Sequence, residues 1–239
     1  MKIRAIILSA LILCGISAVI MYSRAAQPQQ KSSVITQAIN DKNTPMVIKN
    51  LILKMKEQME VNDDQFPELI KEVENYTNSL ADSASVAVLH SMLAEMYQNY
   101  YQRNQWTINQ RTQLSGYIPE DIRVWTSNLF TDKIKEEIDL SLRPTALLQN
   151  TPVSKFKDIL EIGKDSQTLR PTLYEFLAFR ALDIQPTVQI YKDLIAFQNK
   201  EPNMKSVLLT ELDYLRFLYG DKRDKESFEA YMNALDELY

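Results

Sequence analysis

Apolar residues recur every three or four positions along most of this chain, which is the spacing that places them on one face of an α-helix. The pattern is most regular over residues 83–103. It predicts helices at 34–40, 45–59, 63–80, 83–103, 131–142, 153–162, 172–182, 187–198, 204–219 and 222–239. We therefore expect an all-α fold, built as an irregular stack of antiparallel helical hairpins similar to an α-α superhelix but without a regular repeat.

Two helices carry signals at their ends. Thr172 and Glu175 stand three residues apart at the start of the 172–182 helix, which is the spacing of a capping box. Gly220 directly follows the 204–219 helix, and it predicts a left-handed residue that closes this helix. The buried face of the same helix is predicted at Leu208, Leu212, Leu215 and Leu218.

Residues 104–128 lose the helical period although they contain both tryptophans, Trp106 and Trp125. Gly116 and Pro119 interrupt the segment. We therefore predict an ordered connection with short turns that buries both indole rings, since tryptophan is highly buried on average.

The first 25 residues have the pattern of a secretory signal peptide. Lys2 and Arg4 precede an almost wholly apolar run over 5–22, and small residues follow where a signal peptidase cleaves. An uncleaved anchor stays open because the run is near the lower length limit of a membrane-spanning helix, and Cys14 keeps a lipid-anchored form open. We expect export to the periplasm or cell envelope, with a membrane contacted only through this segment if it is uncleaved or lipidated.

The rest of the chain divides by composition. Residues 26–33 are polar and contain proline and glutamine, which is typical of a flexible linker. Residues 34–239 are expected to form the helical domain, and they are numerous enough to bury a core of their own. This domain is either single or divided into two lobes by a break near 104–130.

Charge and cysteine content narrow the choice of partners and chemistry. Removal of residues 1–25 takes away three of 27 basic residues and no acid, which leaves 24 against 31 and a net charge of −7. This acidity argues against nucleic acid as a partner. Cys14 is the only cysteine and lies in the signal segment, so the exported part has no thiol nucleophile, thioester or cysteine-bound metal.

Candidate catalytic groups are sparse. His90 is the only histidine, so a histidine cluster for a metal cannot be assembled. We expect His90 to be a packed, hydrogen-bonded residue. The carboxylate pair Glu136 and Glu137 is expected on a solvated face. The sequence therefore predicts no enzyme, no metal and no cofactor.

Aromatic residues cluster at one place. Tyr97, Tyr100 and Tyr101 share one helix, and Trp106 follows. They form either a ligand or peptide platform, since such side chains contribute much to interfaces, or part of the core between packed helices. These four residues are the candidate interaction surface.

Several strings in the sequence resemble the helical N-terminal region of bacterial alpha-2-macroglobulin-like proteins. They are HSMLAEMYQNYYQRNQW at 90–106, NQRT at 109–112, DIRVW at 121–125, LRPTLYEFLA at 169–178 and RAL at 180–182. With the signal segment, the resemblance spans most of residues 1–185. Family members commonly have a histidine where this chain has Phe179, so a polar role at that position is in doubt.

The resemblance implies a non-catalytic N-terminal scaffold of a much longer exported protease inhibitor. Its partners would be the macroglobulin domains of the same or a neighbouring chain, together with proteases. The family's thioester cysteine, β-sandwich domains and bait segment have no counterpart in this sequence, and no functional residue is carried over because the shared strings look structural. The alternative is a free-standing helical adaptor of the cell envelope that binds a peptide or a glycan.

Overall fold

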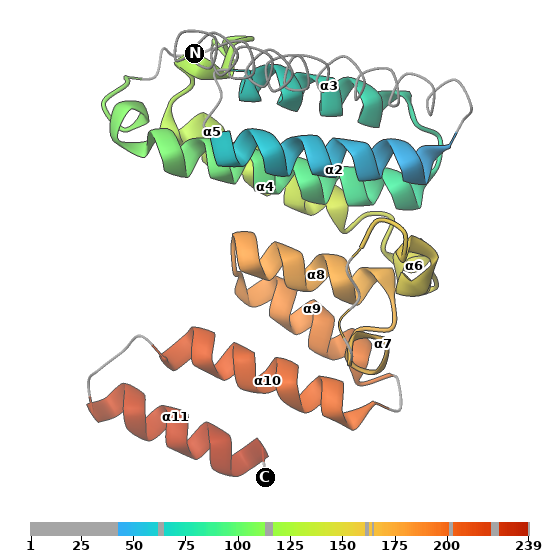
Figure 1. Cartoon of the computed structure of the whole chain (residues 1–239). Helices are drawn as coiled ribbons and strands as arrows, with labels where there is room; N and C mark the ends of the chain where they lie inside the picture. Colours follow the sequence, from blue (N-terminus) through green and yellow to red (C-terminus); the bar gives the residue numbers. More distant parts are fainter. Residues whose placement is uncertain are drawn as a thin grey trace, which may run out of the picture. The chain divides into compact units, whose positions relative to one another are not determined.

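A computed structural model describes residues 43–61, 65–112, 117–160, 163, 165–200, 203–220 and 225–238. No β-strand occurs within these ranges, where the only extended pairing is an isolated antiparallel bridge between Pro152 and Thr172. The predicted all-α class is therefore confirmed (Figure 1), whereas the stacking of antiparallel hairpins stays a prediction.

The helices follow one another with short connections. They are α2 (Thr44–Val61), α3 (Phe66–Ser79), α4 (Ser83–Ile108), α5 (Ser127–Ser141), α6 (Thr145–Gln149), α7 (Ser166–Leu169), α8 (Leu173–Ile184), α9 (Val188–Gln198), α10 (Met204–Tyr219) and α11 (Lys225–Leu238). Two 3-10 turns, η1 (Ile122–Val124) and η2 (Val153–Phe156), lie between them. No helix in the described ranges is long and apolar enough to cross a membrane.

The chain divides into two compact units, Met1–Leu53 and Lys54–Tyr239. Within the first unit the structure describes residues 43–53, which hold the first turns of α2. The predicted signal peptide, the linker and the 34–40 helix lie outside the described residues. A division into lobes near 104–130 stays a prediction.

Within the second unit, α4 packs against three other helices. It contacts α3, α5 and α8. Its buried face includes the fully enclosed side chains of Leu89, Leu93 and Met96, and burial of such side chains is the main stabilising contribution to a core. The Asp82 carboxylate begins α4 by accepting a hydrogen bond from the Ser85 amide at 3.1 Å.

The helix predicted at 83–103 continues to Ile108, so the expected connection begins later than predicted. Ile108 is completely buried and carries the apolar face of α4 one turn farther. The Asn104 side chain donates to the Tyr100 carbonyl oxygen at 2.9 Å, within the same helix. After α4, the predicted ordered connection is confirmed at η1, which precedes the buried indole of Trp125.

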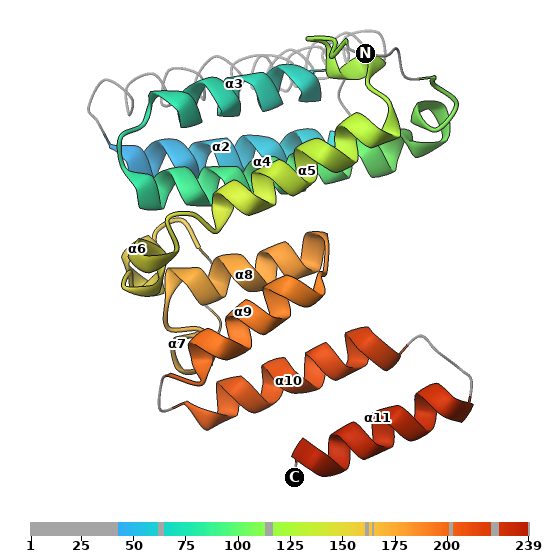
Figure 2. The same cartoon turned by 180° about the vertical axis from the view of Figure 1, so that it is seen from behind.

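Four helices continue the second unit from α8 onward. α8 contacts α6 and α9, α10 contacts α9 and α7, and α11 contacts α10 (Figure 2). Arg180 of α8 reaches α4, where its Nε donates to Ser91 Oγ at 2.9 Å and its guanidinium pairs with Glu95 Oε2 at 2.6 Å. This polar contact joins α8 to α4.

The predicted capping box at the start of α8 is confirmed. Thr172 Oγ1 accepts from the Glu175 amide at 3.2 Å, and Glu175 Oε2 accepts from the Thr172 amide at 3.1 Å. Both partners thus satisfy backbone groups that the first turn of a helix leaves free.

Thr172→Ala should lower the free energy of unfolding by about 1 kcal/mol, because it removes the side-chain acceptor from the first turn of α8. Urea denaturation followed by circular dichroism measures the change. Thr131→Ala is the matched control, since Thr131 is exposed and bonds only within α5, and it should change the value by less than about 0.5 kcal/mol. Equal effects of both substitutions would contradict this role of the capping box.

The short helix expected at 153–162 is wrong over the described residues 153–160, where the 3-10 turn η2 covers Val153–Phe156. The chain before η2 is tethered to the start of α8. There the Val153 amide donates to the Pro171 carbonyl and the Leu173 amide to the Thr151 carbonyl, at 2.9 and 2.8 Å.

Gly220 is right-handed, with φ −62° and ψ −27°, and not left-handed as predicted. Its amide approaches the Arg216 carbonyl oxygen to 2.7 Å, and a Cβ at this position would lie 2.5 Å from that oxygen. Glycine is favoured here because a side chain would clash with the carbonyl oxygen of the preceding turn of α10.

The buried face of α10 also differs from the prediction. Of the four predicted positions, Leu215 is buried as expected, Leu212 and Leu218 are half-buried, and Leu208 is exposed. The buried face also includes Ser206, Val207 and Thr210. Asn203 and Ser206 account for this difference, because Asn203 Nδ2 donates to the Thr168 carbonyl and Ser206 Oγ donates to the Leu169 carbonyl. These bonds to α7 turn a more polar face of α10 inward.

Candidate functional site

The four predicted aromatic site residues divide between core and surface. Tyr97 is 1% exposed and stacks on Trp125 at a ring-centroid distance of 5.7 Å. Tyr100 and Tyr101 are half-buried against the ring of Phe130, at 5.6 and 5.8 Å. These three tyrosines therefore contribute to the packing between α4 and α5.

Burial also shapes the chemistry of Tyr97. Its hydroxyl donates to Glu74 Oε1 of α3 at 2.6 Å. Burial raises the pKa of Tyr97 far above its ordinary value, and the hydrogen bond to Glu74 adds to the shift. The phenol is a neutral donor that joins α3 to α4.

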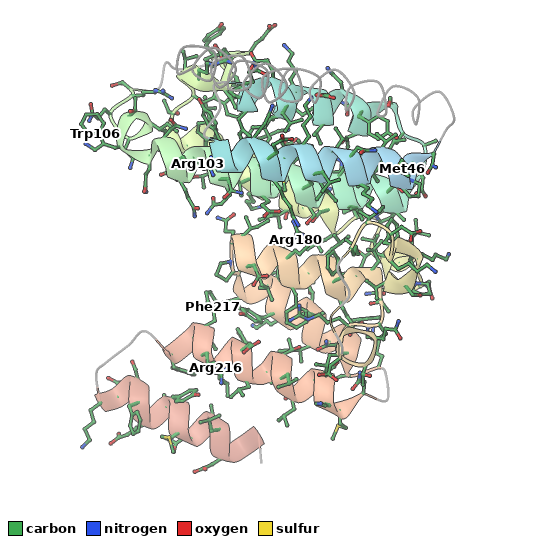
Figure 3. The ribbon with its side chains drawn as sticks, in the orientation of Figure 1. Met46, Arg103, Trp106, Arg180, Arg216 and Phe217 are labelled. Atoms are coloured by element: carbon green, nitrogen blue, oxygen red, sulfur yellow. The ribbon has the colours of Figure 1, made fainter. Side chains whose placement is uncertain are left out.

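Trp106 differs from the tyrosines. It is 78% exposed in the last turn of α4, and its ring points away from the helices (Figure 3). The predicted burial is confirmed for Trp125 and wrong for Trp106, because Trp106 lies two positions before the buried Ile108 and so on the opposite side of the helix. Tyr117, Ile118 and Val124 of the following connection are exposed as well.

A buried polar cluster joins α4 to α5. Glu137 is 2% exposed, and its two carboxylate oxygens lie 2.6 Å from His90 Nδ1 and 2.8 Å from Lys133 Nζ. His90 is thus a packed, hydrogen-bonded residue, as predicted. The expected solvated position of Glu137 is wrong, because its helix turns this carboxylate toward His90 of α4.

The environment of Glu137 pulls its pKa in two directions. Burial by itself would raise the pKa, but the hydrogen bonds from His90 and Lys133 outweigh it and hold the pKa below its ordinary value of 4.5. The ionised form is therefore the one that the folded protein stabilises. With both oxygens engaged, the group supports structure and is not poised to accept a substrate proton.

Acidification should weaken the fold through Glu137. Since the pKa is lower in the folded than in the unfolded chain, its stabilising contribution is present above pH 4.5 and is lost as pH falls through the lower folded value. The difference in unfolding free energy between wild type and Glu137→Gln should therefore shrink below pH 4.5. Urea denaturation over a pH series measures it, and a pH-independent difference would contradict this assignment.

A polar pocket lies where helix ends meet in the second unit. The last turns of α6 and α9 approach the first turns of α8 and α10 there, beside α7 (Figure 2). Its volume is about 550 Å³. The carboxamides of Gln149, Asn150, Gln167, Gln198 and Asn203 line it together with Glu175, and the other lining residues are threonines and prolines.

Gln198 and Glu175 form the buried side of this pocket, which we call the carboxamide pocket. Gln198 is 1% exposed, and its Nε2 donates to Glu175 Oε1 at 3.2 Å. Gln198 Oε1 is buried without a hydrogen-bond partner in the described part of the chain. A buried acceptor of this kind is destabilising unless a donor reaches it.

Sequence reasoning missed the carboxamide pocket. Its residues come from five helix ends between 149 and 203, and no short motif contains them. Only the capping box at Thr172 and Glu175 was visible, and it predicted the start of a helix, not a cavity beside it.

The described residues contain no group of three or more His, Cys, Asp or Glu that could hold a metal ion. Of the predicted carboxylate pair, Glu136 pairs with Lys133 at 3.0 Å on the surface of α5. No protein-family model, curated protein or solved structure matches this chain.

Proposed function

We propose that this chain is a non-catalytic helical scaffold at the N-terminal end of an exported alpha-2-macroglobulin-like protein. In this role it contacts the macroglobulin domains of the same or a neighbouring chain. The sequence strings that resemble the family motivate the proposal. The contact between the helices that carry the two long strings supports it.

One observation carries the proposal. The first long string of family resemblance, 90–106, lies on α4, and the second, 169–182 apart from Phe179, runs from the last residue of α7 into α8. Helices α4 and α8 contact each other, and Arg180 of the second string bonds Ser91 and Glu95 of the first. The strings therefore make one helix-to-helix contact, which is what a scaffold needs and a catalytic site does not.

The buried polar pair between α4 and α5 also supports a scaffold role. His90 and Glu137 engage each other across the contact of α4 with α5. Trp106, in contrast, offers a large aromatic side chain to the outside (Figure 3). Tryptophan is enriched where proteins bind one another, so Trp106 is the side chain we assign to the contact with a macroglobulin domain.

The native product tests the proposal. An antibody raised against this helical region should detect, in the envelope fraction of the source cells, a protein much larger than the 27.7 kDa of this chain. A native product of this size or smaller, with no macroglobulin protein encoded beside it, would overturn the proposal.

A photo-crosslink tests the assigned contact. Benzoylphenylalanine in place of Trp106, in the full-length protein, should crosslink to a macroglobulin domain, and mass spectrometry of the digest identifies the partner residues. The same replacement at Phe228 is the matched control, since Phe228 is also an exposed aromatic residue, at 61%, but lies on α11. Equal yields at both positions would remove Trp106 from the contact.

The second candidate is a free-standing envelope adaptor, which the carboxamide pocket favours because it offers a built cavity with an unsatisfied acceptor. The immunoblot distinguishes the two candidates. An adaptor predicts a native product no larger than this chain, and the scaffold predicts a much larger one.

A further inference from the structure

The carboxamide pocket holds more hydrogen-bonding capacity than the protein itself uses. We propose that it binds an extended, uncharged segment of peptide through the peptide backbone. This inference is independent of the scaffold proposal, because it rests on contacts within the second unit alone.

The orientation of Gln198 follows from its neighbour. A carboxylate accepts hydrogen bonds only, so Glu175 fixes the amide nitrogen of Gln198 on its own side, at 3.2 Å. Glu175 Oε2 is already engaged by the amide and hydroxyl of Thr172, at 3.1 and 2.8 Å. The carbonyl oxygen of Gln198 is therefore left buried without a donor in the described part of the chain, and a backbone N–H that enters the pocket would be a suitable one.

Three further carboxamides provide matching groups at the rim. Asn150 Nδ2 donates to the Ala146 carbonyl at 2.7 Å, which leaves its oxygen as an acceptor. Gln149 and Gln167 make no side-chain hydrogen bond to any residue in the described ranges. Each carries one acceptor and two donors.

The charge and shape of the lining select a peptide over other ligands. Among the described lining residues Glu175 is the only charged one, and it disfavours phosphate or carboxylate. None of the described lining residues is aromatic, so they offer a sugar ring no face to stack on. A carboxamide presents an N–H donor and a C=O acceptor next to each other. It can therefore pair with the N–H and C=O of one residue of an extended peptide, which point to the same side.

The volume of the pocket is large enough for a short peptide segment. Its volume of about 550 Å³ lies within the range of roughly 300–1,000 Å³ that ligand pockets occupy. The buried oxygen of Gln198 would provide the deepest contact, and Gln149 and Gln167 would hold the segment at the rim.

Side-chain amide signals in nuclear magnetic resonance spectra of the 15N-labelled protein test this inference. The probe is the blocked tetrapeptide acetyl-Ala-Ala-Ser-Ala-amide, added at millimolar concentration. The signals of Gln149, Gln167 and Gln198 should shift. Those of Gln102 and Gln189 should not, since both are exposed on other surfaces, on α4 and on the outer face of α9.

Substitutions give the second readout. Gln198→Ala should weaken binding of the tetrapeptide roughly three- to tenfold, the worth of one hydrogen bond. The double variant Gln149→Ala/Gln167→Ala should weaken it at least as much, and it keeps the test valid if Gln198→Ala does not fold. Gln102→Ala and Gln189→Ala are the matched controls and should leave binding unchanged.

Three outcomes would overturn the inference. One is the absence of any shift at the highest peptide concentration. Another is an equal loss of binding in the control variants. The third is that only tetra-N-acetylchitotetraose, added in a parallel titration, shifts the pocket signals, because the pocket would then be a glycan site.

Discussion

Phe130→Ala should destabilise the protein by about 3–5 kcal/mol, the largest effect we expect from a single substitution. Phe130 is 0% exposed. Its ring lies between aromatic side chains of α4 and the connection, with centroids 5.6 Å from Tyr100, 5.8 Å from Tyr101 and 5.3 Å from Trp125. Truncation would leave a cavity that these rings cannot fill without moving.

Guanidinium denaturation monitored by circular dichroism measures this loss. Phe228→Ala is the matched control, because it removes the same ring from an exposed position on α11. We expect it to change the unfolding free energy by less than about 0.5 kcal/mol. Similar losses in the two variants would mean that Phe130 is not the centre of the aromatic packing between α4 and α5.

Glu137→Gln should have the second-largest effect, a loss of about 2–4 kcal/mol at neutral pH. The substitution keeps the shape of the side chain but removes the charge that His90 and Lys133 share, at 2.6 and 2.8 Å. Lys133 would then be left half-buried with only the exposed Glu136 as an acidic partner.

Asp139→Asn on the same helix is the control for Glu137→Gln. It breaks a pair of similar length, 2.7 Å to Lys135, but both side chains are exposed. Exposed pairs contribute little to stability, so the control should cost at most about 1 kcal/mol. If both substitutions had the same cost, burial would not be what makes the Glu137 cluster important.

The sequence correctly predicted those features of the fold that are determined by residues close together within one helix. The capping box needs only Thr172 and Glu175, which are three residues apart, and the regular face of α4 repeats within a single segment. Both signals are local, and the structure confirms both.

Other features depend on contacts far along the chain, which local spacing does not contain. Glu137 looks like a surface acid until α5 lies against His90, 47 residues earlier. The buried face of α10 is set by bonds of Asn203 and Ser206 to α7 carbonyls. The carboxamide pocket needs five helix ends together, so no part of it could be predicted from its residues alone.

The start of α5 is an error of helix boundary. The predicted helix began at residue 131, whereas α5 starts at Ser127 and includes Phe130 in its first turn. Phe130 stands four residues before Ile134 and eight before Ile138, so it continues the apolar period of the predicted helix. Its partners are rings on α4, which only the packed structure brings near.

The length of α4 has a mechanical consequence. With 26 residues and a rise of about 1.5 Å per residue, the helix is a rod roughly 39 Å long. Ser91, where α8 is attached, and Trp106 are separated by about 22 Å along its axis. If a macroglobulin domain binds at Trp106 as proposed, α4 would hold it at a fixed distance from the point where α8 is attached, and would thus act as a spacer between the two.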